Sequence, residues 1–328
     1  NKRYFALKKL GYKEIPDAWI EKVTDLSEEQ KREFIIKDNA HWGSEWDLEL
    51  LEEWKVDLED WGVEIEDFDV EQEVIEDNYE FNDNIETDIV LGDLIEIGEH
   101  RLLCGDSTDI EQIKKLMNGE KADMVLTDPP YGINLDTDYS DMKGWHQGKK
   151  YNKVIGDGDD FNDRFINNIF SFFKGVKEKF LFGADYYVEL LPNYGKDGSW
   201  FVWDKRVDES KDKMFGSGFE LLWSENRHQR RILRGMWAGF MGDAEANRRV
   251  HPTQKPTKIL VEILNEYSKE GSIIVDLFGG SGSTLIACEK TNRKCYMMEI
   301  DPIYCQVIVN RMRELDSNLV IKKNGVII

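Results

Sequence analysis

From residue 91 onward, short apolar runs alternate with helical patterns, and this alternation restricts the possible fold more than any other feature of the chain. Eight of the runs have the length and boundaries of buried strands: HRLLCGD, ADMVLTD, KFLFGAD, SWFVWDK, FELLWSE, SIIVDLFG, KCYMMEI and LVIKKN. Helical patterns lie between several of them, at residues 109–118, 161–178, 256–270, 283–291 and 302–315. Strands that are apolar on both faces need cover on both faces, so the sequence predicts an α/β fold with a mostly parallel sheet.

The run SIIVDLFGGSGSTLIACEK, residues 272–290, predicts a strand, a glycine-rich turn and a helix opened by Ser283 and Thr284. Glycines let the backbone approach a ligand at the helix N-terminus. The next strand ends in Glu299, 19 residues after Gly280, which is the spacing at which an acid binds ribose hydroxyls. Any tight strand–helix turn favours glycine, but the whole unit favours a ligand that carries a ribose.

NAD is one such ligand, although the sequence disfavours it. Counted from Gly280, the pattern G-x-G-x-x-G lacks its third glycine, because Leu285 stands there. No Walker A motif is present either, so the turn does not require a phosphate.

Residues 125–132 read VLTDPPYG and form a second unusual strand ending. Proline has no N–H and a fixed φ, so the chain cannot continue as a strand after Asp128. Taken alone, the motif is also consistent with an ordinary D-P-P turn followed by a core tyrosine.

Together the two motifs resemble those of the β-group DNA amino-methyltransferases, enzymes that use S-adenosylmethionine (SAM). Phe278, Gly280 and Gly282 match the family motif F-x-G-x-G, and residues 128–131 match D-P-P-Y. HPTQKP, residues 251–256, matches the motif that precedes F-x-G-x-G in one subgroup, and catalytic motif before cofactor motif is the circularly permuted order of the β group. The resemblance covers about residues 95–315.

The resemblance implies a Rossmann-like SAM-dependent methyltransferase fold, with a seven-stranded mixed sheet and helices on both faces. SAM is the expected cofactor, with Glu299 at its ribose, Asp106 near its adenine, and Thr253 and Lys255 near its methionine carboxylate. Without the motif, Lys255 could as well be a surface lysine. The expected cofactor-binding residues are Asp106, Thr253, Lys255, Asp276, Phe278, Gly280, Gly282, Ser283, Thr284 and Glu299.

The catalytic residues that the resemblance implies are Asp128, Pro129, Pro130 and Tyr131. The target base must leave the duplex before its amine can react. Asp128 and the carbonyl oxygen of Pro129 can then accept the two amine hydrogens, while Tyr131 offers a stacking face. No metal is expected. An Asp at the first motif position favours adenine N6 as the target, with cytosine N4 as the alternative.

Two segments are candidates for DNA contact. Residues 132–160 form a long polar stretch that we expect to be a mobile loop, and it includes Lys149 and Lys150. Residues of about 205–250 occupy the place of the target recognition region, where Arg227, Arg230, Arg231 and Arg234 suit phosphates or guanine edges. A solvated basic helix face is the alternative.

The formal net charge of −22 does not exclude a DNA partner. Residues 41–100 carry 23 acidic residues and one lysine, so the rest of the chain has no net charge. We interpret the acidic segment as a solvated linker. The alternative is that this segment covers a basic groove.

The expected organisation has three parts. Residues 1–55 resemble the end of a ParB-like module, in which Arg3 matches the arginine of a G-x-x-R motif; residues 56–90 form the acidic linker, and residues 91–328 form the methyltransferase domain. The four cysteines include no C-x-x-C pair, which suits a reducing cytoplasm, and no membrane span or signal peptide is visible. We therefore expect a cytoplasmic protein of prokaryotic or phage origin, with double-stranded DNA as its partner, a possible homodimer and a place in restriction-modification.

Three rival functions remain at this point. One is an RNA or protein amino-methyltransferase, although the protein-glutamine type usually has Asn in place of Asp128. Another is a catalytically degenerate DNA-binding protein, which the intact motifs disfavour. The third is an NAD oxidoreductase.

Overall fold

The computed structural model describes Ser27, Tyr79 and residues 85–135, 153–206, 217–235 and 254–328. The chain divides into two units, Asn1–Gln72 and Glu73–Ile328, and the fold given below belongs to the second. The predicted ParB-like part, apart from Ser27, lies outside the described residues, as do Lys149, Lys150, Thr253 and parts of the linker, the polar loop and the recognition region.

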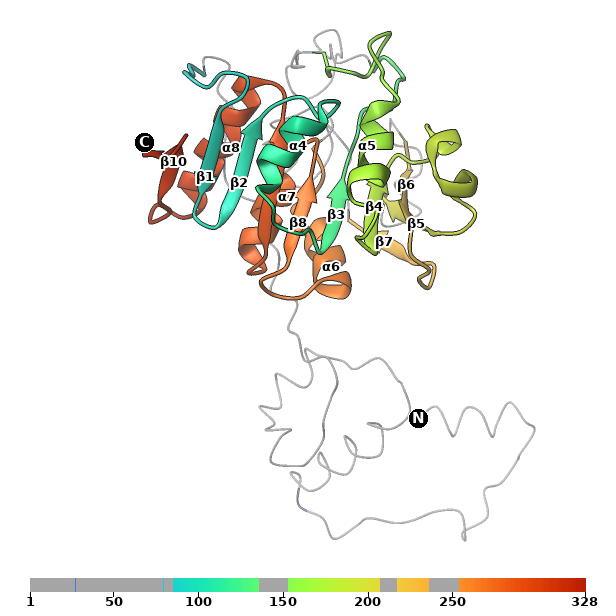
Figure 1. Cartoon of the computed structure of the whole chain (residues 1–328). Coiled ribbons are helices and arrows are strands. Elements are labelled where there is room, and N and C mark those ends of the chain that lie inside the picture. The colour runs from blue at the N-terminus through green and yellow to red at the C-terminus, as the bar shows by residue number, and fades with distance from the viewer. Residues whose placement is uncertain (1–26, 28–78, 80–84, 136–152, 207–216, 236–253) are drawn as a thin grey trace, which may run out of the picture. The chain divides into compact units, whose positions relative to one another are not determined.

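A single mixed sheet runs through the described residues in the order β11-β10-β1-β2-β9-β8-β3-β4-β6-β5-β7 (Figure 1). Its strands are β1 (Leu94–Ile97), β2 (His100–Cys104), β3 (Met124–Thr127), β4 (Glu178–Phe182), β5 (Ser199–Asp204), β6 (Phe219–Ser224), β7 (Ile232–Arg234), β8 (Ile273–Asp276), β9 (Lys294–Glu299), β10 (Ile321–Lys323) and β11 (Val326–Ile327). The helices are α4 (Ile110–Met117), α5 (Arg164–Phe172), α6 (Thr257–Tyr267), α7 (Ser283–Lys290) and α8 (Pro302–Leu315), with short 3-10 turns η2 (Val188–Leu190) and η3 (Pro192–Gly195).

All eight predicted strand segments and all five predicted helical segments contain the expected element. The predicted count of seven strands is wrong, because the described sheet has eleven. The unpredicted strands β1, β7 and β11 are two to four residues long, too short for a clear alternation. They extend the sheet beyond β2 and beyond β5.

Strand direction gathers the loops of interest at one edge. β2, β9, β8, β3 and β4 pair in parallel in that order, so their carboxyl ends lie at the same edge of the sheet. β6 runs antiparallel to both β4 and β5, and its amino-terminal end therefore lies at this edge as well.

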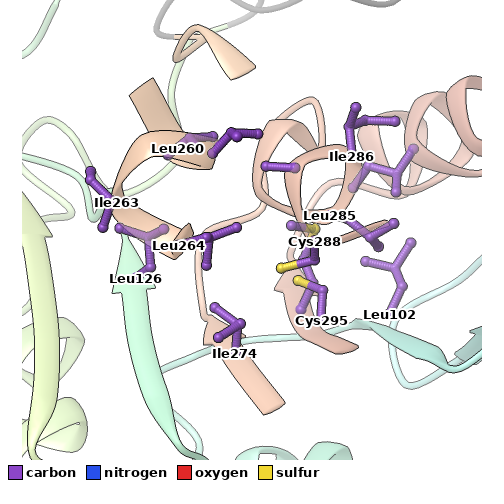
Figure 2. Close-up of a cluster of buried hydrophobic side chains, with 14 of the residues drawn as sticks. Leu102, Leu126, Leu260, Ile263, Leu264, Ile274, Leu285, Ile286, Cys288 and Cys295 are labelled. Atoms are coloured by element: carbon purple, nitrogen blue, oxygen red, sulfur yellow. The ribbon is translucent and has the colours of Figure 1, made fainter. Parts of the chain in front are cut away.

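Two hydrophobic clusters, one on each face of the sheet, hold the fold together. Successive residues of a strand point to opposite faces, so on β8 Ile274 packs in one cluster and Val275 in the other. The first cluster joins the sheet to α6, α7 and α8, and Figure 2 shows part of it, with Leu102 and Ile274 facing Leu264 and Leu285. The second joins the sheet to α4 and α5. Helices on both faces confirm the predicted α/β class.

The last residues before β1 also pack on this body, within the range that we expected to be linker. Tyr79 is buried with Tyr304 and Val307 of α8, and the Thr87 hydroxyl donates a hydrogen bond to Gln306 at 3.1 Å. Among the described helices, none is long and apolar enough to cross a membrane.

Candidate active site

The D-P-P-Y turn leaves the carboxyl end of β3, and a buried aspartate fixes the chain that follows. Asp157 Oδ1 accepts hydrogen bonds from the backbone N–H groups of Tyr131 at 2.9 Å and Gly132 at 3.0 Å. Its Oδ2 accepts from the N–H of Leu135 at 2.8 Å. Asp157 lies in the stretch that we expected to be a polar loop, and no local motif marks it in the sequence. One carboxylate thus sets the course of the backbone beside Asp128.

Both carboxylate oxygens of Asp128 have a partner. The Tyr131 hydroxyl donates to Oδ1 at 2.6 Å, and the Lys255 ammonium donates to Oδ2 at 2.6 Å. Lys255 is buried, so the reading of this residue as a surface lysine is wrong. Its predicted contact with the methionine carboxylate stays a prediction.

Glu220, at the start of β6, completes this group of side chains. Its Oε1 accepts from the Tyr131 hydroxyl at 2.8 Å and lies 2.9 Å from the Lys255 ammonium, and its Oε2 accepts from Lys205 at 2.7 Å. We call Asp128, Tyr131, Lys205, Glu220 and Lys255 the carboxylate network. The sequence did not mark Glu220 as a site residue, because it lies in neither motif.

Burial and the two ammonium groups set the protonation of this network in opposite directions. Burial raises the pKa of Asp128, although Lys255 opposes the shift. Burial also acts to raise the pKa of Glu220, but Lys255 and Lys205 together outweigh it and lower that pKa to about 2. The two carboxylates outweigh burial at Lys255 and raise its pKa. Lys255 is therefore charged and Glu220 ionised at neutral pH.

The ring of Tyr131 is packed as tightly as its hydroxyl. It stacks on Tyr186 with ring centroids 5.0 Å apart and an interplanar angle of 10°, and Tyr187 lies at 6.3 Å. Tyr186 keeps 52% of its surface exposed. Gly183 approaches the ring so closely that a Cβ there would lie 2.1 Å from it. Tyr186 thus presents an aromatic surface to solvent next to Tyr131.

The glycine turn after β8 lies next to the D-P-P-Y turn, because β8 and β3 are neighbours in the sheet. The Thr127 hydroxyl donates to Asp276 Oδ1 at 2.7 Å across the two strands. Asp276 also accepts from the N–H of Phe278 at 3.1 Å, and Thr284 donates to it as well. Burial raises the pKa of Asp276 to about 6.

Glu299, at the end of β9, holds the glycine turn from the other side. Its Oε2 accepts from the N–H of Gly280 at 2.7 Å, and its Oε1 accepts from the N–H of Asp301 at 2.9 Å. Burial raises the pKa of this carboxyl to about 7 despite these bonds. Gly282 has φ +88, and a Cβ there would lie 2.8 Å from Ile308, so only glycine fits.

Three other predicted cofactor residues lie at the same edge. The Ser283 hydroxyl is buried and has no hydrogen-bond partner among the described residues. Phe278 packs edge-on against Phe165 at 5.5 Å. Asp106 follows β2, where its Oδ1 accepts from the N–H of Thr108 at 2.8 Å. In the described ranges, no group of three or more His, Cys, Asp and Glu side chains is placed to hold a metal ion.

The arginines that we predicted for DNA contact differ in their surroundings. Arg227, Arg230 and Arg234 are exposed, and Arg227 donates to the carbonyl oxygen of Asp197 at 3.3 Å. Arg231 is partly buried and pairs with Glu266 of α6 at 3.1 Å. Three of the four are therefore available to a ligand from solvent.

Comparisons with known proteins find similarity to DNA methyltransferases. Residues 196–310 match the family model N6_N4_Mtase, described as DNA methylase. The type II methyltransferase M.HpaI of Haemophilus parainfluenzae is 24% identical over 65% of this chain and 74% of its own length. M.HinfI of Haemophilus influenzae is 22% identical over 66% of this chain and 69% of its own. The crystal structure of the M1.HpyAVI–SAM complex has a TM-score of 0.42 and 19% identity, and it covers 64% of this chain and 98% of that one.

Proposed function

We propose that this chain transfers a methyl group from SAM to the N6 amine of adenine in duplex DNA. Its family match and its type II relatives support a DNA amino-methyltransferase. The observation that carries the proposal is the placement of two motifs 150 residues apart on neighbouring strands. The Thr127–Asp276 hydrogen bond of 2.7 Å joins the strand that carries Asp128 to the strand that carries the glycine turn.

The residues around the glycine turn fit SAM. Glu299 uses one lone pair of each oxygen on a backbone N–H, which leaves lone pairs for ribose hydroxyls. The unpartnered hydroxyl of Ser283, at the first turn of α7, offers a hydrogen bond to the cofactor. Asp106 would hold the adenine and Thr253 the methionine carboxylate.

When bound, SAM would supply the methyl group to the amine, and the amine would give up one proton. The chain supplies the geometry. Asp128 and the Pro129 carbonyl accept the amine hydrogens, which turns the nitrogen lone pair toward the methyl carbon. The two prolines hold that carbonyl in place at little cost in entropy. Asp128, whose pKa burial raises, would take the released proton.

The flipped base needs an aromatic surface, and Tyr131 with its stacked partner Tyr186 supplies one. The duplex itself is proposed to lie along Arg227, Arg230 and Arg234, together with Lys149 and Lys150. The names of the relatives suit a place in restriction-modification, and a homodimer remains part of the proposal.

Adenine is proposed because Asp, not Ser, stands at the first position of D-P-P-Y. The family model covers N6 and N4 amines alike, so cytosine N4 is the alternative product. Both bases present an exocyclic amine to the same two acceptors, and the choice between them depends on the shape of the base pocket.

The test is to incubate the full chain with methyl-labelled SAM and duplex DNA, digest the DNA and identify labelled nucleosides by mass spectrometry. N6-methyladenine is the expected product. N4-methylcytosine would change only the proposed target base. Label on RNA or protein, with none on DNA, would overturn the proposal.

Asp128→Ala is the matched catalytic variant. It should reduce transfer by at least about 100-fold, because the amine loses its charged acceptor, while the SAM dissociation constant changes little. Transfer at the wild-type rate would remove Asp128 from the mechanism.

A further inference from the structure

The carboxylate network shares its hydrogen-bond donors between two carboxylates, Asp128 and Glu220. Tyr131 and Lys255 each donate to one oxygen of Asp128, at 2.6 Å in both cases. An incoming amine must donate to one of the same oxygens. Each oxygen of Asp128 has a second lone pair for the amine, and that oxygen is the stronger acceptor when the Tyr131 hydrogen points to another carboxylate.

Glu220 lies where it can receive both donors. It is 2.8 Å from the Tyr131 hydroxyl and 2.9 Å from the Lys255 ammonium, so neither group has to travel to change partner. A tyrosine hydroxyl carries one hydrogen, which can point well toward only one of the two carboxylates. A lysine carries three and can serve both at once.

The fold holds Glu220 in this position from the opposite side. Lys205 donates to its second oxygen at 2.7 Å, and the backbone N–H of Lys205 donates to the carbonyl oxygen of Gly218 at 3.0 Å. Glu220 pairs with Trp203 in the β5–β6 ladder. The acceptor is thus built into the sheet and does not depend on a loop.

We propose that Glu220 is a positioning residue for Asp128, which takes the Tyr131 hydrogen and retains the Lys255 ammonium while Asp128 turns an oxygen to the target amine. This inference rests on the proposed function. It adds a second carboxylate to the site, with a role distinct from that of the D-P-P-Y motif: Asp128 meets the substrate, and Glu220 accepts the donors that Asp128 releases.

The test compares Glu220→Gln with the wild type in the full chain. The amide keeps the shape but loses the charge, so the hydroxyl and the ammonium stay on Asp128. We expect kcat for transfer to duplex DNA to fall by about 10- to 100-fold, while the SAM dissociation constant by calorimetry stays within about twofold. Glu99→Gln is the charge-matched control: Glu99 is exposed, precedes the amino end of β2 at the opposite edge, and should leave kcat unchanged.

A double-mutant cycle separates positioning from a general loss of structure. In a Tyr131→Phe background there is no hydroxyl hydrogen to receive, so Glu220→Gln should lower kcat by only about threefold or less. Equal losses in both backgrounds, or a loss of SAM affinity as large as the loss of kcat, would mean a structural role and overturn the inference.

Glu220→Asp is the second variant to test if Glu220→Gln does not fold. It keeps the charge but shortens the reach to Tyr131, so kcat should fall at least about fivefold at unchanged SAM affinity. Wild-type kcat in a folded Glu220 variant overturns the role of Glu220 alone. A wild-type chain that methylates no DNA overturns the proposed function, and this inference with it.

Discussion

Gly183 shows how a single atom can matter to this site. It has φ +60, and its missing Cβ leaves room for the Tyr131 ring, which a methyl group would meet at 2.1 Å. The residue lies at the end of β4, directly beside D-P-P-Y. A glycine at this position therefore gives the Tyr131 ring the space that it occupies.

Gly183→Ala should displace the Tyr131 ring and reduce methyl transfer by at least about tenfold. Gly119→Ala is the matched control, because Gly119 has φ +83 and nothing within 4 Å of its Cβ position. Both variants bear the strain of a left-handed alanine, about 1–2 kcal/mol, but only the first meets the ring. Steady-state transfer rates with thermal midpoints check this, and equal activities would show that the ring does not need the space.

Glu299 predicts how SAM affinity depends on pH. Burial raises its pKa to about 7, above its ordinary 4.5, so a part of the population is protonated at neutral pH. The ionised form accepts ribose hydroxyls better, and SAM should bind about tenfold more tightly at pH 8 than at pH 6. Calorimetric titrations at the two pH values measure this. In Glu299→Gln the ratio should fall to about one, and an unchanged ratio would assign the effect to another group.

The arginines from Arg227 through β7 differ in exposure and in ion pairing. Arg231 pairs with Glu266 of α6, whereas Arg230 and Arg234 are exposed. A basic patch read from the sequence is therefore partly an intramolecular contact. The apolar pattern of β6 predicts a strand but not its direction. Because β6 runs antiparallel to β4, Glu220 lies at the edge where the parallel strands have their carboxyl ends.

Arg230→Gln and Arg234→Gln should each weaken DNA binding and reduce the slope of log affinity against log salt by about 1. Arg231→Gln should act mainly on stability and leave that slope unchanged, because its partners are Glu262 and Glu266. Fluorescence anisotropy over a salt series gives the slopes. A slope that changes only for Arg231→Gln would reverse the assignment.

Across the residues that the structure describes, local patterns were enough to predict the α/β class, five helices and eight strands, because burial on both faces leaves long apolar runs. They also placed Asp128, Asp276 and Glu299 at strand ends. Since the carboxyl ends of parallel strands share an edge, these residues could be expected to lie near one another.

Glu220, Asp157 and Gly183 could not be identified in this way. Each acts through a neighbour distant in sequence: Glu220 through Lys255, Asp157 through the Tyr131 backbone, and Gly183 through the Tyr131 ring. No periodicity or spacing encodes such a contact. The proposed chemistry was thus readable from two short motifs, whereas the partners of Asp128 follow from strand order and direction, because hydrogen bonds and ion pairs depend on distances that only the folded sheet sets.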